Sequence, residues 1–547
     1  MRRLARWAIL LSLVLLVPTA IPVGPSHSTA SSPSMISPDT TVNWSTFQRY
    51  TSTVNVDFSP SVVQAIDGTV WVFYSVTPIG VNGSPTSPPQ IRYRTSTTLS
   101  ATYNASLWSA EQILVNPPFS QNDSPSATAL SNGTIFLAFS SNRTGFNNIY
   151  LKKYLPTQGW QPEVQVTWTN TNDKEPSVVA MKDGSVWVFY YRIISGTQYN
   201  IYYKINRNGA WSAETAFTND NSAQNTDPSA YQMRNGTTWV VWSHYDSTGQ
   251  RLLYKTYNPT TQAWSGQVQL TNTSNPDIHP AITQDQNSTM WLAWSRELSC
   301  GGTCFQWDVY YKYSTNGGSS WTTETNFTND AACTSNCADD MMSNNVQLKD
   351  GRIYLFWAST RDPQNYWDIY YASTVPQPFH NVAVTALVVS PSIIRLGGIV
   401  TINVTVTDFG TFPESFFLFV TATNITSTNI VVQYLSLAAG QSMKIPIAWT
   451  GSPLPAGEYV IKANIPAVNS EIVTGDNTMS APKMHMYPTG DVNYDGTTNI
   501  VDLAIIAAAY KTSVGQPGYN PAADLNGDGQ VNIQDLAICA ADFGHTG

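Results

Sequence analysis

Charged residues are scarce in this sequence. Asp, Glu, Lys and Arg together make up 12% of the 547 residues, and the formal net charge is −9. A protein that binds nucleic acid or an anionic membrane surface needs a basic surface to contact the phosphates, and this composition does not provide one. The sequence therefore predicts no nucleic-acid partner.

Long apolar runs are also missing after the first twenty residues. The segment Trp7 to Val17 is almost wholly apolar, follows three arginines and ends at Pro18. It is too short for a membrane-spanning helix and has the charge pattern of a secretory signal, with small residues near Ala20 and Ala30 at which cleavage is expected. We expect a signal peptide over residues 1–30 and a secreted, extracellular or surface-associated mature chain without a transmembrane anchor.

Cysteine is rare, with five residues in the whole chain. Four of them form two close pairs in Gly-, Ser- and Asn-rich loops, Cys300 with Cys304 and Cys333 with Cys337. In an exported protein this arrangement predicts two loop disulfides with three possible pairings. A four-thiolate zinc site is the alternative, although its usual ligand spacing differs. Cys539 lies in an apolar helical stretch, where we expect a buried free thiol.

Residues typical of strands and turns are abundant. Aromatic residues make up 12% and apolar residues 42% of the chain, with 33 Gly and 33 Pro. This composition predicts a mainly β protein of about two to four domains.

One phrase recurs six times between residues 43 and 375: Pro-Ser, an apolar stretch, Asp-Gly or Asn-Gly, and a run such as Val-Trp-Val-Phe. Its anchors are Pro60/Gly68, Pro125/Gly133, Pro176/Gly184, Pro228/Gly236, Pro280/Ser288 and Ser343/Gly351. Asp-Gly or Asn-Gly between two apolar runs predicts a hairpin. An Ile-Tyr or Leu-Tyr phrase and then, in five units, a tryptophan phrase follow, which gives four strands per unit of roughly 50 to 65 residues, the size of a propeller blade.

The sixth tryptophan phrase is missing after Tyr371, and a matching one, Trp44-Ser45, stands at the start of the repeat region. A strand moved from the last unit to the first is how a propeller ring closes. The pattern therefore predicts a six-bladed β-propeller, with an open sandwich as the alternative.

The segment Ser314 to Trp321, which reads Ser-Thr-Asn-Gly-Gly-Ser-Ser-Trp, resembles the Asp-box turn of the sialidase superfamily, with Asn in place of Asp. The resemblance implies a propeller fold and no catalysis, because the turn is structural. The early Phe/Tyr-Arg-Ile-Pro segment of that family is absent from this chain.

Each unit carries an acid or amide three residues before its anchor: Asp57, Asn122, Asp173, Asn225, Asp277 and Asp340. Cationic residues follow the hairpins and should lie on the same face: Arg143, Arg192, His244, Arg296 and Arg361. Such a ring could hold a sugar or a metal ion. If the propeller is a glycoside hydrolase, the catalytic candidates are Asp57, Asp173, Asp277, Asp340, Glu297, Arg192 and Arg296. The alternative is structural, with the same residues forming Asx-turns and salt bridges between blades.

Residues 379–487 follow a proline-rich linker and alternate apolar with polar positions, for example in 382–389 and 399–406. About seven short strands in about a hundred residues predict an immunoglobulin-like β-sandwich. The order of these pieces is similar to the CARDB family of cell-surface modules, which implies a spacer or cell-adhesion unit.

Two segments at the C-terminus repeat with an offset of 33 residues, Asp491–Asp502 and Asp524–Asp535. Oxygen-bearing residues stand at loop positions 1, 3, 5, 9 and 12, and Gly stands at position 6, as a calcium loop requires. The expected ligands are Asp491, Asn493, Asp495, Thr497 (backbone), Asn499 and Asp502 in the first loop, and Asp524, Asn526, Asp528, Gln530 (backbone), Asn532 and Asp535 in the second. The sequence therefore predicts two bound Ca²⁺ ions.

Each loop leads into an apolar stretch that predicts a helix, over 503–510 and 536–543. Residues 488–547 resemble a type I dockerin, because position 12 is Asp and no clear helix precedes the first loop. The resemblance implies a cohesin-type partner that contacts loop positions 10 and 11, here Ile500, Val501, Ile533 and Gln534. These differ from the common Ser-Thr pair of the family.

Two functions fit these observations. One is a secreted modular protein that docks to a cohesin-type partner while its propeller binds glycan or protein. The other is a dockerin-borne glycoside hydrolase, sialidase-like or of another kind, that acts in polysaccharide catabolism.

Overall fold

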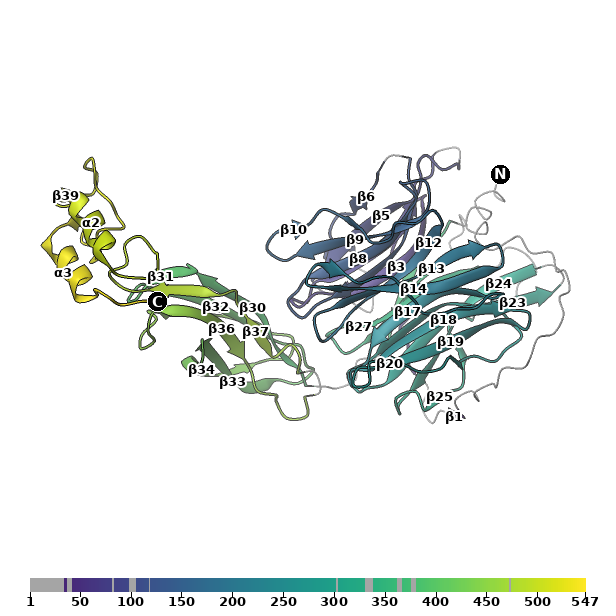
Figure 1. The fold of residues 1–547 in the computed structure, drawn as a ribbon. Helices are drawn as coiled ribbons and strands as arrows, with labels where there is room; N and C mark the ends of the chain where they lie inside the picture. The colour runs from purple at the N-terminus through teal and green to yellow at the C-terminus, as the bar shows by residue number, and fades with distance from the viewer. Residues whose placement is uncertain are drawn as a thin grey trace. The chain divides into compact units, whose positions relative to one another are not determined.

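The computed structural model (Figure 1) describes residues 34–36, 42–80, 83–97, 105–117, 119–301, 304–329, 338–361, 366–374, 380–471 and 474–547. The chain divides into two compact units, residues 1–377 and 378–547. Strands dominate both units, as the sequence predicts. Within the described residues, no helix combines the length and apolarity needed to cross a bilayer. The expected signal peptide lies outside the described residues.

The N-terminal unit contains six antiparallel meanders, each with its strands in chain order. Meander 1 is β3 (Val56–Gln64), β4 (Val70–Thr77), β5 (Gln90–Ser96) and β6 (Gln112–Val115), with a 3₁₀ turn at Ala105–Leu107. Meander 2 is β7 (Asn122–Ala129), β8 (Ile135–Ser141), β9 (Asn148–Leu155), β10 (Gly159–Trp160) and β11 (Val164–Gln165). Meander 3 is β12 (Asn172–Ala180), β13 (Val186–Ser195), β14 (Gln198–Arg207), β15 (Ala210–Trp211) and β16 (Thr215–Ala216).

Meanders 4 to 6 repeat this order. Meander 4 is β17 (Gln224–Gln232), β18 (Thr238–Asp246), β19 (Gly249–Asn258), β20 (Ala263–Trp264) and β21 (Val268–Gln269). Meander 5 is β22 (Asp277–Gln284), β23 (Met290–Gly301), β24 (Cys304–Ser314), β25 (Ser320–Thr322) and β26 (Thr325–Asn326), and the short β1 (Ser34–Ile36) runs parallel to β25. Meander 6 is β27 (Asp340–Gln347), β28 (Ile353–Ser359) and β29 (Asp368–Ser373), completed by β2 (Gln48–Arg49).

The predicted Asp-Gly and Asn-Gly turns join the first two strands of each meander. Gly68 and its equivalents have positive φ angles between 78° and 88°, a region that glycine enters without steric cost. The fifth turn has Ser288 at this place, with φ of 65°. The hairpins that the sequence predicts are therefore confirmed.

The Pro-Ser phrase connects neighbouring meanders. The hydroxyl of Ser61 accepts a hydrogen bond at 2.9 Å from the backbone N–H of Ala127, in the first strand of the next meander. The equivalent bonds run from Val178 to Ser126, from Ala230 to Ser177 and from Ile282 to Ser229, at 3.0 to 3.1 Å. Between meanders 6 and 1, the side-chain carbonyl of Asn344 accepts from the N–H of Val62 at 3.1 Å. The repeated serine therefore joins neighbouring first strands at four junctions, and Asn344 does so at a fifth.

The N-terminal segment completes the sixth meander. Gln48 and Arg49 pair with Tyr371 and Tyr370 of β29, and Trp44 forms a bridge with Thr374. This is the displaced strand that the sequence predicts. The indole of Trp44 packs against Phe327 of meander 5, with ring centroids 4.9 Å apart, so the segment also fills the core between meanders 5 and 6.

The predicted disulfides lie outside the described residues. Cys333 and Cys337 belong to a stretch that the structure does not describe, and Cys300 and Cys304 are described only as backbone, at the ends of β23 and β24. Cys539 is a buried free thiol, as predicted. Burial, followed by the charges of Asp502 and Asp542, raises the pKa of this thiol to about 11.

The second unit begins with two sheets that share one apolar core. One sheet has the order β30 (Val382–Ser390), β32 (Val400–Asp408) and β35 (Ser442–Trp449). The other has the order β31 (Ile393–Arg395), β38 (Met484–Tyr487), β36 (Gly457–Asn464), β33 (Glu414–Thr423) and β34 (Ser427–Leu437), with β37 (Thr478–Ser480) beside β36. Burial alternates along β32, β33 and β35, so the period-two pattern correctly predicts strands here.

Two short helices end the chain, α2 (Ile500–Ala508) and α3 (Ile533–Ala541), with the small pair β39 (Thr512–Ser513) and β40 (Gln530–Val531) beside them. Both helices begin three residues earlier and end two residues earlier than predicted. Asn499 and Asn532 are the N-caps, and Asp502 and Asp535 at the third helical position complete a capping box. Position 12 of each loop therefore belongs to the helix, which the apolar pattern alone did not indicate.

The position of Trp44 generates a stability prediction. Replacing Trp44 with Ala should lower the free energy of unfolding of the N-terminal unit by about 2–3 kcal/mol, because it leaves a cavity among Trp291, Tyr311 and Phe327. Thermal unfolding followed by tryptophan fluorescence measures the change. Trp168→Ala is the matched control, since that side chain is 76% exposed and its loss should change stability by less than about 0.5 kcal/mol. Equal unfolding temperatures for the two variants would contradict the role assigned to the N-terminal segment.

Candidate functional site

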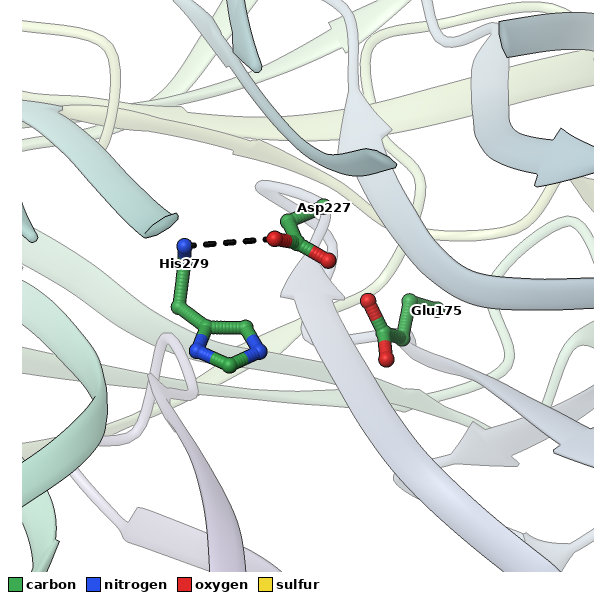
Figure 2. A group of neighbouring side chains, drawn as sticks. All are labelled: Glu175, Asp227 and His279. Atoms are coloured by element: carbon green, nitrogen blue, oxygen red, sulfur yellow. Dashed lines mark hydrogen bonds between the residues drawn. The ribbon is translucent and has the colours of Figure 1, made fainter. Parts of the chain in front are cut away.

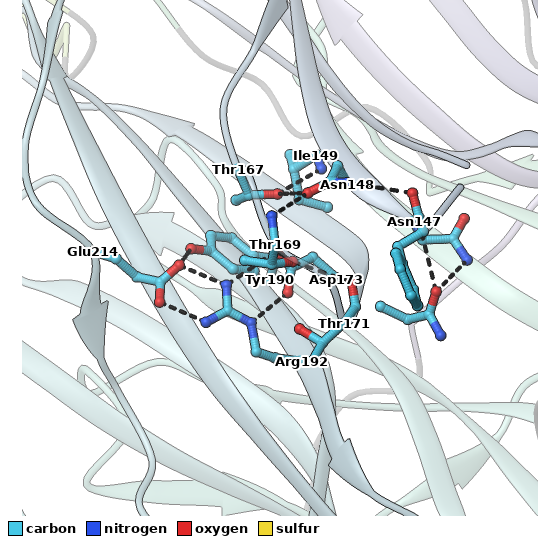
Figure 3. Close-up of polar contacts among 12 residues, drawn as sticks. Asn147, Asn148, Ile149, Thr167, Thr169, Thr171, Asp173, Tyr190, Arg192 and Glu214 are labelled. Atoms are coloured by element: carbon cyan, nitrogen blue, oxygen red, sulfur yellow. Dashed lines mark hydrogen bonds and ion pairs between the residues drawn. The ribbon is translucent and has the colours of Figure 1, made fainter. Parts of the chain in front are cut away.

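The predicted ring of polar residues is engaged in contacts inside the meanders. In meander 3, Asp173 of β12 and Arg192 of β13 are register partners, and the Nε–Oδ1 distance is 2.6 Å. Arg192 also contacts Glu214 at 2.7 Å, and Glu214 accepts a hydrogen bond from the Tyr190 hydroxyl (Figure 3). The guanidinium lies over the ring of Tyr202, 4.6 Å from its centroid. All hydrogen-bonding groups of this cluster face one another.

The other meanders repeat the arrangement. Asp277 accepts from Arg296 at 2.6 Å and from the Trp294 indole at 3.0 Å, and Asp340 accepts from Arg361 at 2.7 Å and from the Trp357 indole at 2.9 Å. Asn225 contacts His244 and Trp242, and Asn122 contacts Arg143 and Ser141. The ion pairs lie within single meanders, so the expected salt bridges between blades are wrong in this detail, whereas the amides of Asn122 and Asn225 also donate to carbonyls of the preceding meander. Five of the six ring residues hold β-strands together.

Asp57 is the exception in the ring. Its register partner on β4 is Val76, so it has no arginine where Asp173 and Asp277 have one. The carboxylate is buried, its Oδ2 lies 3.5 Å from the Thr53 hydroxyl, and its Oδ1 has no hydrogen-bond partner among the described residues. Burial raises the pKa of Asp57 to about 8. This carboxyl group is therefore protonated over much of the acidic and neutral range.

Glu297 lies apart from the ring. It follows Arg296 on β23, its N–H donates to the Pro276 carbonyl at 3.0 Å, and its register partner is Trp307. Burial raises the pKa of its carboxyl. Among the described residues, the Glu297 carboxyl forms no hydrogen bond or ion pair with another catalytic candidate, and the adjacent Arg296 pairs with Asp277 and Glu324 instead.

A second ring, which the sequence analysis did not single out, lies two residues further along each first strand. Each first strand carries a β-bulge at this place, and the bulged residue has a positive φ between 47° and 55° although it is not glycine. The six residues are Ser59, Ser124, Glu175, Asp227, His279 and Met342. With the two residues that follow each of them, they line a cavity of about 140 Å³. We call it the axial cavity.

Three neighbouring members of this ring carry ligand-type side chains. Glu175, Asp227 and His279 each place one ligand atom within 4.8 Å of the others (Figure 2). Asp227 Oδ2 accepts from the Ser243 hydroxyl at 2.8 Å and from the backbone N–H of His279 at 3.3 Å. Glu175 Oε2 and His279 Nδ1 are buried and have no hydrogen-bond partner among the described residues. Burial, and then the charge of Asp227, raises the pKa of Glu175 well above its usual value.

The sequence contained a signal for this ring. In the aligned repeat, the position before the conserved Pro changes chemical type from unit to unit, whereas the position three before the anchor is always Asp or Asn. Variation inside a repeat marks a position that serves something other than the repeat itself, although the residue just before it, from Phe58 in the first unit to Met341 in the sixth, varies as well. The β-bulge hid the direction in which the side chains of this ring point, because one extra residue breaks the period-two alternation of a strand.

The two C-terminal loops have nearly the same hydrogen-bond pattern. Asp502 accepts backbone hydrogen bonds from Val492 and Asn499, both at 2.8 Å, and Asp535 accepts from the equivalent Leu525 and Asn532 at 2.7 and 2.8 Å. At position 1 of each loop, Asp491 and Asp524 accept from the glycine N–H at position 6, each at 2.8 Å. Both position-12 carboxylates are buried.

The chemistry of this donor set suits calcium. Each loop gathers three aspartates and two asparagines around one turn, with Gly496 or Gly529 at positive φ to make the bend. A hard divalent cation takes six to eight such oxygens, and clustered carboxylates repel one another without it. Burial raises the pKa of Asp491, and the neighbouring charge of Asp502 acts in the same direction.

The residues predicted to contact a partner lie at the starts of the two helices. Ile500 is 68% exposed and Ile533 is 64% exposed, and Val501 is exposed beside them. The amide of Gln534 accepts a hydrogen bond from Asn526 at 2.8 Å, which holds it over the second loop. Large exposed apolar side chains beside a ligand loop are typical of a docking surface.

Asp57 generates a pH-dependent prediction. Its pKa is about 8 in the folded chain and close to 4 when unfolded, so the stabilising proton is bound at acidic pH and stability falls as pH rises from about 4 to about 8. Asp57→Asn should remove this loss, because Asn already stands at the equivalent position in meanders 2 and 4. We expect the variant to exceed the parent in unfolding temperature clearly at pH 8 and little at pH 5.

Thermal unfolding of the full chain at pH 5, 6.5 and 8 measures this difference. Asp67→Asn, at an exposed turn position, is the control and should shift all three temperatures alike. A gain for Asp57→Asn that is the same at every pH would refute a buried, uncompensated carboxyl group.

Comparison with known proteins matches residues 489–541 to the Dockerin type I domain. No curated protein sequence matches the chain. Among solved structures, a protein of unknown function from Dyadobacter fermentans DSM 18053 is similar with a TM-score of 0.50 and 12% identity, over 61% of this chain and 99% of that one.

Two enzymes are similar at lower scores. The α-L-arabinanase of Penicillium chrysogenum, complexed with arabinobiose, has a TM-score of 0.41 and 15% identity over 61% of this chain and 98% of its own. The Hadza microbial sialidase Hz136 has a TM-score of 0.43 and 12% identity over 58% of this chain and 66% of its own. At such identities a likeness concerns the fold alone. The chain is thus a mainly β protein that ends in a segment similar to type I dockerin domains.

Proposed function

We propose that this chain is an exported modular protein that docks, through its two calcium loops, onto a cohesin-type partner and presents its N-terminal unit to a glycan. The observation that carries the proposal is the pair of matching loops, each with an exposed isoleucine at position 10, accompanied in the first loop by Val501 at position 11. Two Ca²⁺ ions, one per loop, would neutralise the clustered carboxylates and fix the starts of α2 and α3.

In this proposal the six meanders are the blades of a closed six-bladed β-propeller. The support is the serine hydrogen bond that recurs between neighbouring first strands, together with the β2–β29 pairing. The two-sheet segment after residue 379 serves as a CARDB-like, immunoglobulin-type spacer. Its β31 contacts the first calcium loop through Arg395, whose Nε donates to the Asp491 carbonyl at 2.8 Å.

Exposed aromatic residues favour a glycan as the ligand of the propeller. Trp168 is 76% exposed and precedes β12, and Phe119 precedes β7 in the same way. Phe146 lies in the turn between β8 and β9, and Tyr245 lies at the end of β18. In an antiparallel meander these places share one edge, the edge that carries the polar ring. Aromatic faces at such an edge suit stacking against sugar rings, as amphipathic rings do at other half-wet surfaces.

A glycoside hydrolase is the second candidate. The observation in its favour is the carboxyl pair Glu175 and Asp227 in the axial cavity, one of which has a raised pKa. Their ligand oxygens lie within 4.8 Å of each other, a spacing that suits the close carboxyl pair of a retaining enzyme and not the wider pair of an inverting one. However, the ring aspartates Asp173, Asp277 and Asp340 are held by arginines. Binding is therefore preferred to hydrolysis.

Docking is tested by titrating the full chain against a panel of type I cohesin modules by calorimetry. We expect binding in calcium and none in chelator. Ile500→Asp with Ile533→Asp should weaken binding at least about a hundredfold, because the change places charges in an apolar contact, while leaving the two calcium equivalents intact. Val514→Asp is the matched control, since Val514 is equally exposed (68%) and lies outside the loops. Failure to bind any cohesin in calcium would refute the docking role.

Glycan binding is tested with the full chain on an array of plant, fungal and host glycans. We expect retention without release of reducing sugar, and Trp168→Ala should reduce retention about tenfold by removing a stacking surface. Turnover that Glu175→Gln or Asp227→Asn abolishes would replace the binding role by the hydrolase. If no glycan is retained, the glycan assignment falls while docking stands.

A further inference from the structure

The axial cavity carries an inference beyond docking and glycan binding. Glu175, Asp227 and His279 come from three successive meanders, which are separated by more than 50 residues each in the sequence. Their convergence is produced by the bulges in β12, β17 and β22, where each residue takes a left-handed backbone conformation. Non-glycine residues pay a steric cost for this conformation, so it persists where the surroundings require it.

Two of the three side chains, Glu175 and His279, have a buried atom without the partner that such a polar group needs. Glu175 Oε2 and His279 Nδ1 are buried without hydrogen bonds among the described residues. In the described part of the chain, neither Glu175 nor Asp227 forms an ion pair with Lys or Arg, whereas Asp173, Asp277 and Asp340 each do. A buried carboxylate without a partner costs several kcal/mol, which the group avoids by taking up a proton or a cation.

The other half of the ring carries no charged side chain. Ser59 and Ser124 occupy the equivalent positions in meanders 1 and 2, and Met342 in meander 6, where its sulfur accepts from the Ser59 hydroxyl at 3.2 Å. The two serines are smaller than Glu175, Asp227 and His279, and the methionine sulfur is a softer atom than their oxygens and nitrogen. The cavity of about 140 Å³ lies among these six residues. A site with three protein ligands on one side and free space on the other matches metal centres that keep a position for water or an exogenous ligand.

We infer that Glu175, Asp227 and His279 form a binding site for one divalent transition-metal ion, with zinc or manganese as its occupant, open towards the axial cavity. Two carboxylate oxygens and one imidazole nitrogen suit these ions, whereas calcium takes six to eight oxygens and disfavours nitrogen. The metal site does not depend on the proposed glycan ligand, although a sugar hydroxyl could occupy its open position.

The test titrates Zn²⁺, and separately Mn²⁺, into the full-length protein by calorimetry in excess calcium, so that the C-terminal loops are already filled. We expect one equivalent per chain, and a rise in unfolding temperature of the N-terminal unit with metal concentration. Glu175→Gln and His279→Gln should each weaken binding on the order of a hundredfold.

His485→Gln is the matched control. His485 forms an exposed pair with Glu458 at 3.0 Å, the kind of surface site that binds zinc weakly, and its loss should leave the single equivalent unchanged. Unaltered binding in Glu175→Gln and His279→Gln, with both variants folded by circular dichroism, would show adventitious binding and overturn the inference. Absence of zinc and manganese heat in excess calcium would equally overturn it. This titration does not measure glycan retention, so failure of the metal site and failure of the glycan assignment are seen separately.

Discussion

The bulge in the first strand of each meander is the constraint on which the N-terminal unit depends. It lets the residue before the Pro-Ser phrase turn towards the axial cavity, while the serine behind it accepts a hydrogen bond from the neighbouring strand. The backbone N–H of a bulged residue also donates to a neighbouring meander, as the N–H of Glu175 does to the Ser140 hydroxyl at 3.1 Å. Buried backbone donors therefore find partners across meanders, where a regular ladder cannot supply them.

Much of this organisation could be predicted because it repeats. Glycine turns, the displaced strand at Trp44 and the duplicated acidic loops each follow from a local rule that applies several times in one sequence. The polar ring could also be placed, but its chemistry could not be decided. Arg192 and Asp173 stand nineteen residues apart, and only the register of β12 with β13 shows that they neutralise each other.

The axial residues escaped prediction for a different reason. In a regular strand, side chains alternate between the two faces, so the sequence pattern shows which face each residue occupies. The bulge inserts one residue and breaks this alternation just before the Pro-Ser phrase. Residues 57 and 59, although two apart in one strand, therefore do not face the same surface. The backbone N–H of Asp57 donates to the Trp367 carbonyl at 2.8 Å, whereas Ser59 lines the axial cavity. Each first strand has two neighbouring ring positions. Only the backbone geometry, and not the composition, decides which of them reaches the axial cavity.

The two calcium loops show how equal sequences can acquire unequal surroundings. Arg395 donates to the carbonyls of Asp491 and Val492, and its guanidinium lies 4.7 Å from the ring centroid of Tyr494. The first loop is thereby fastened to β31, whereas Asp524 of the second loop accepts from Tyr519 of its own module at 2.8 Å. Since an arginine that binds two loop carbonyls limits how the loop can move, the first loop should be the more rigid of the two. The order of the second loop should then depend more on the bound ion, because among the described residues no hydrogen bond joins that loop to the sheets of residues 380–487.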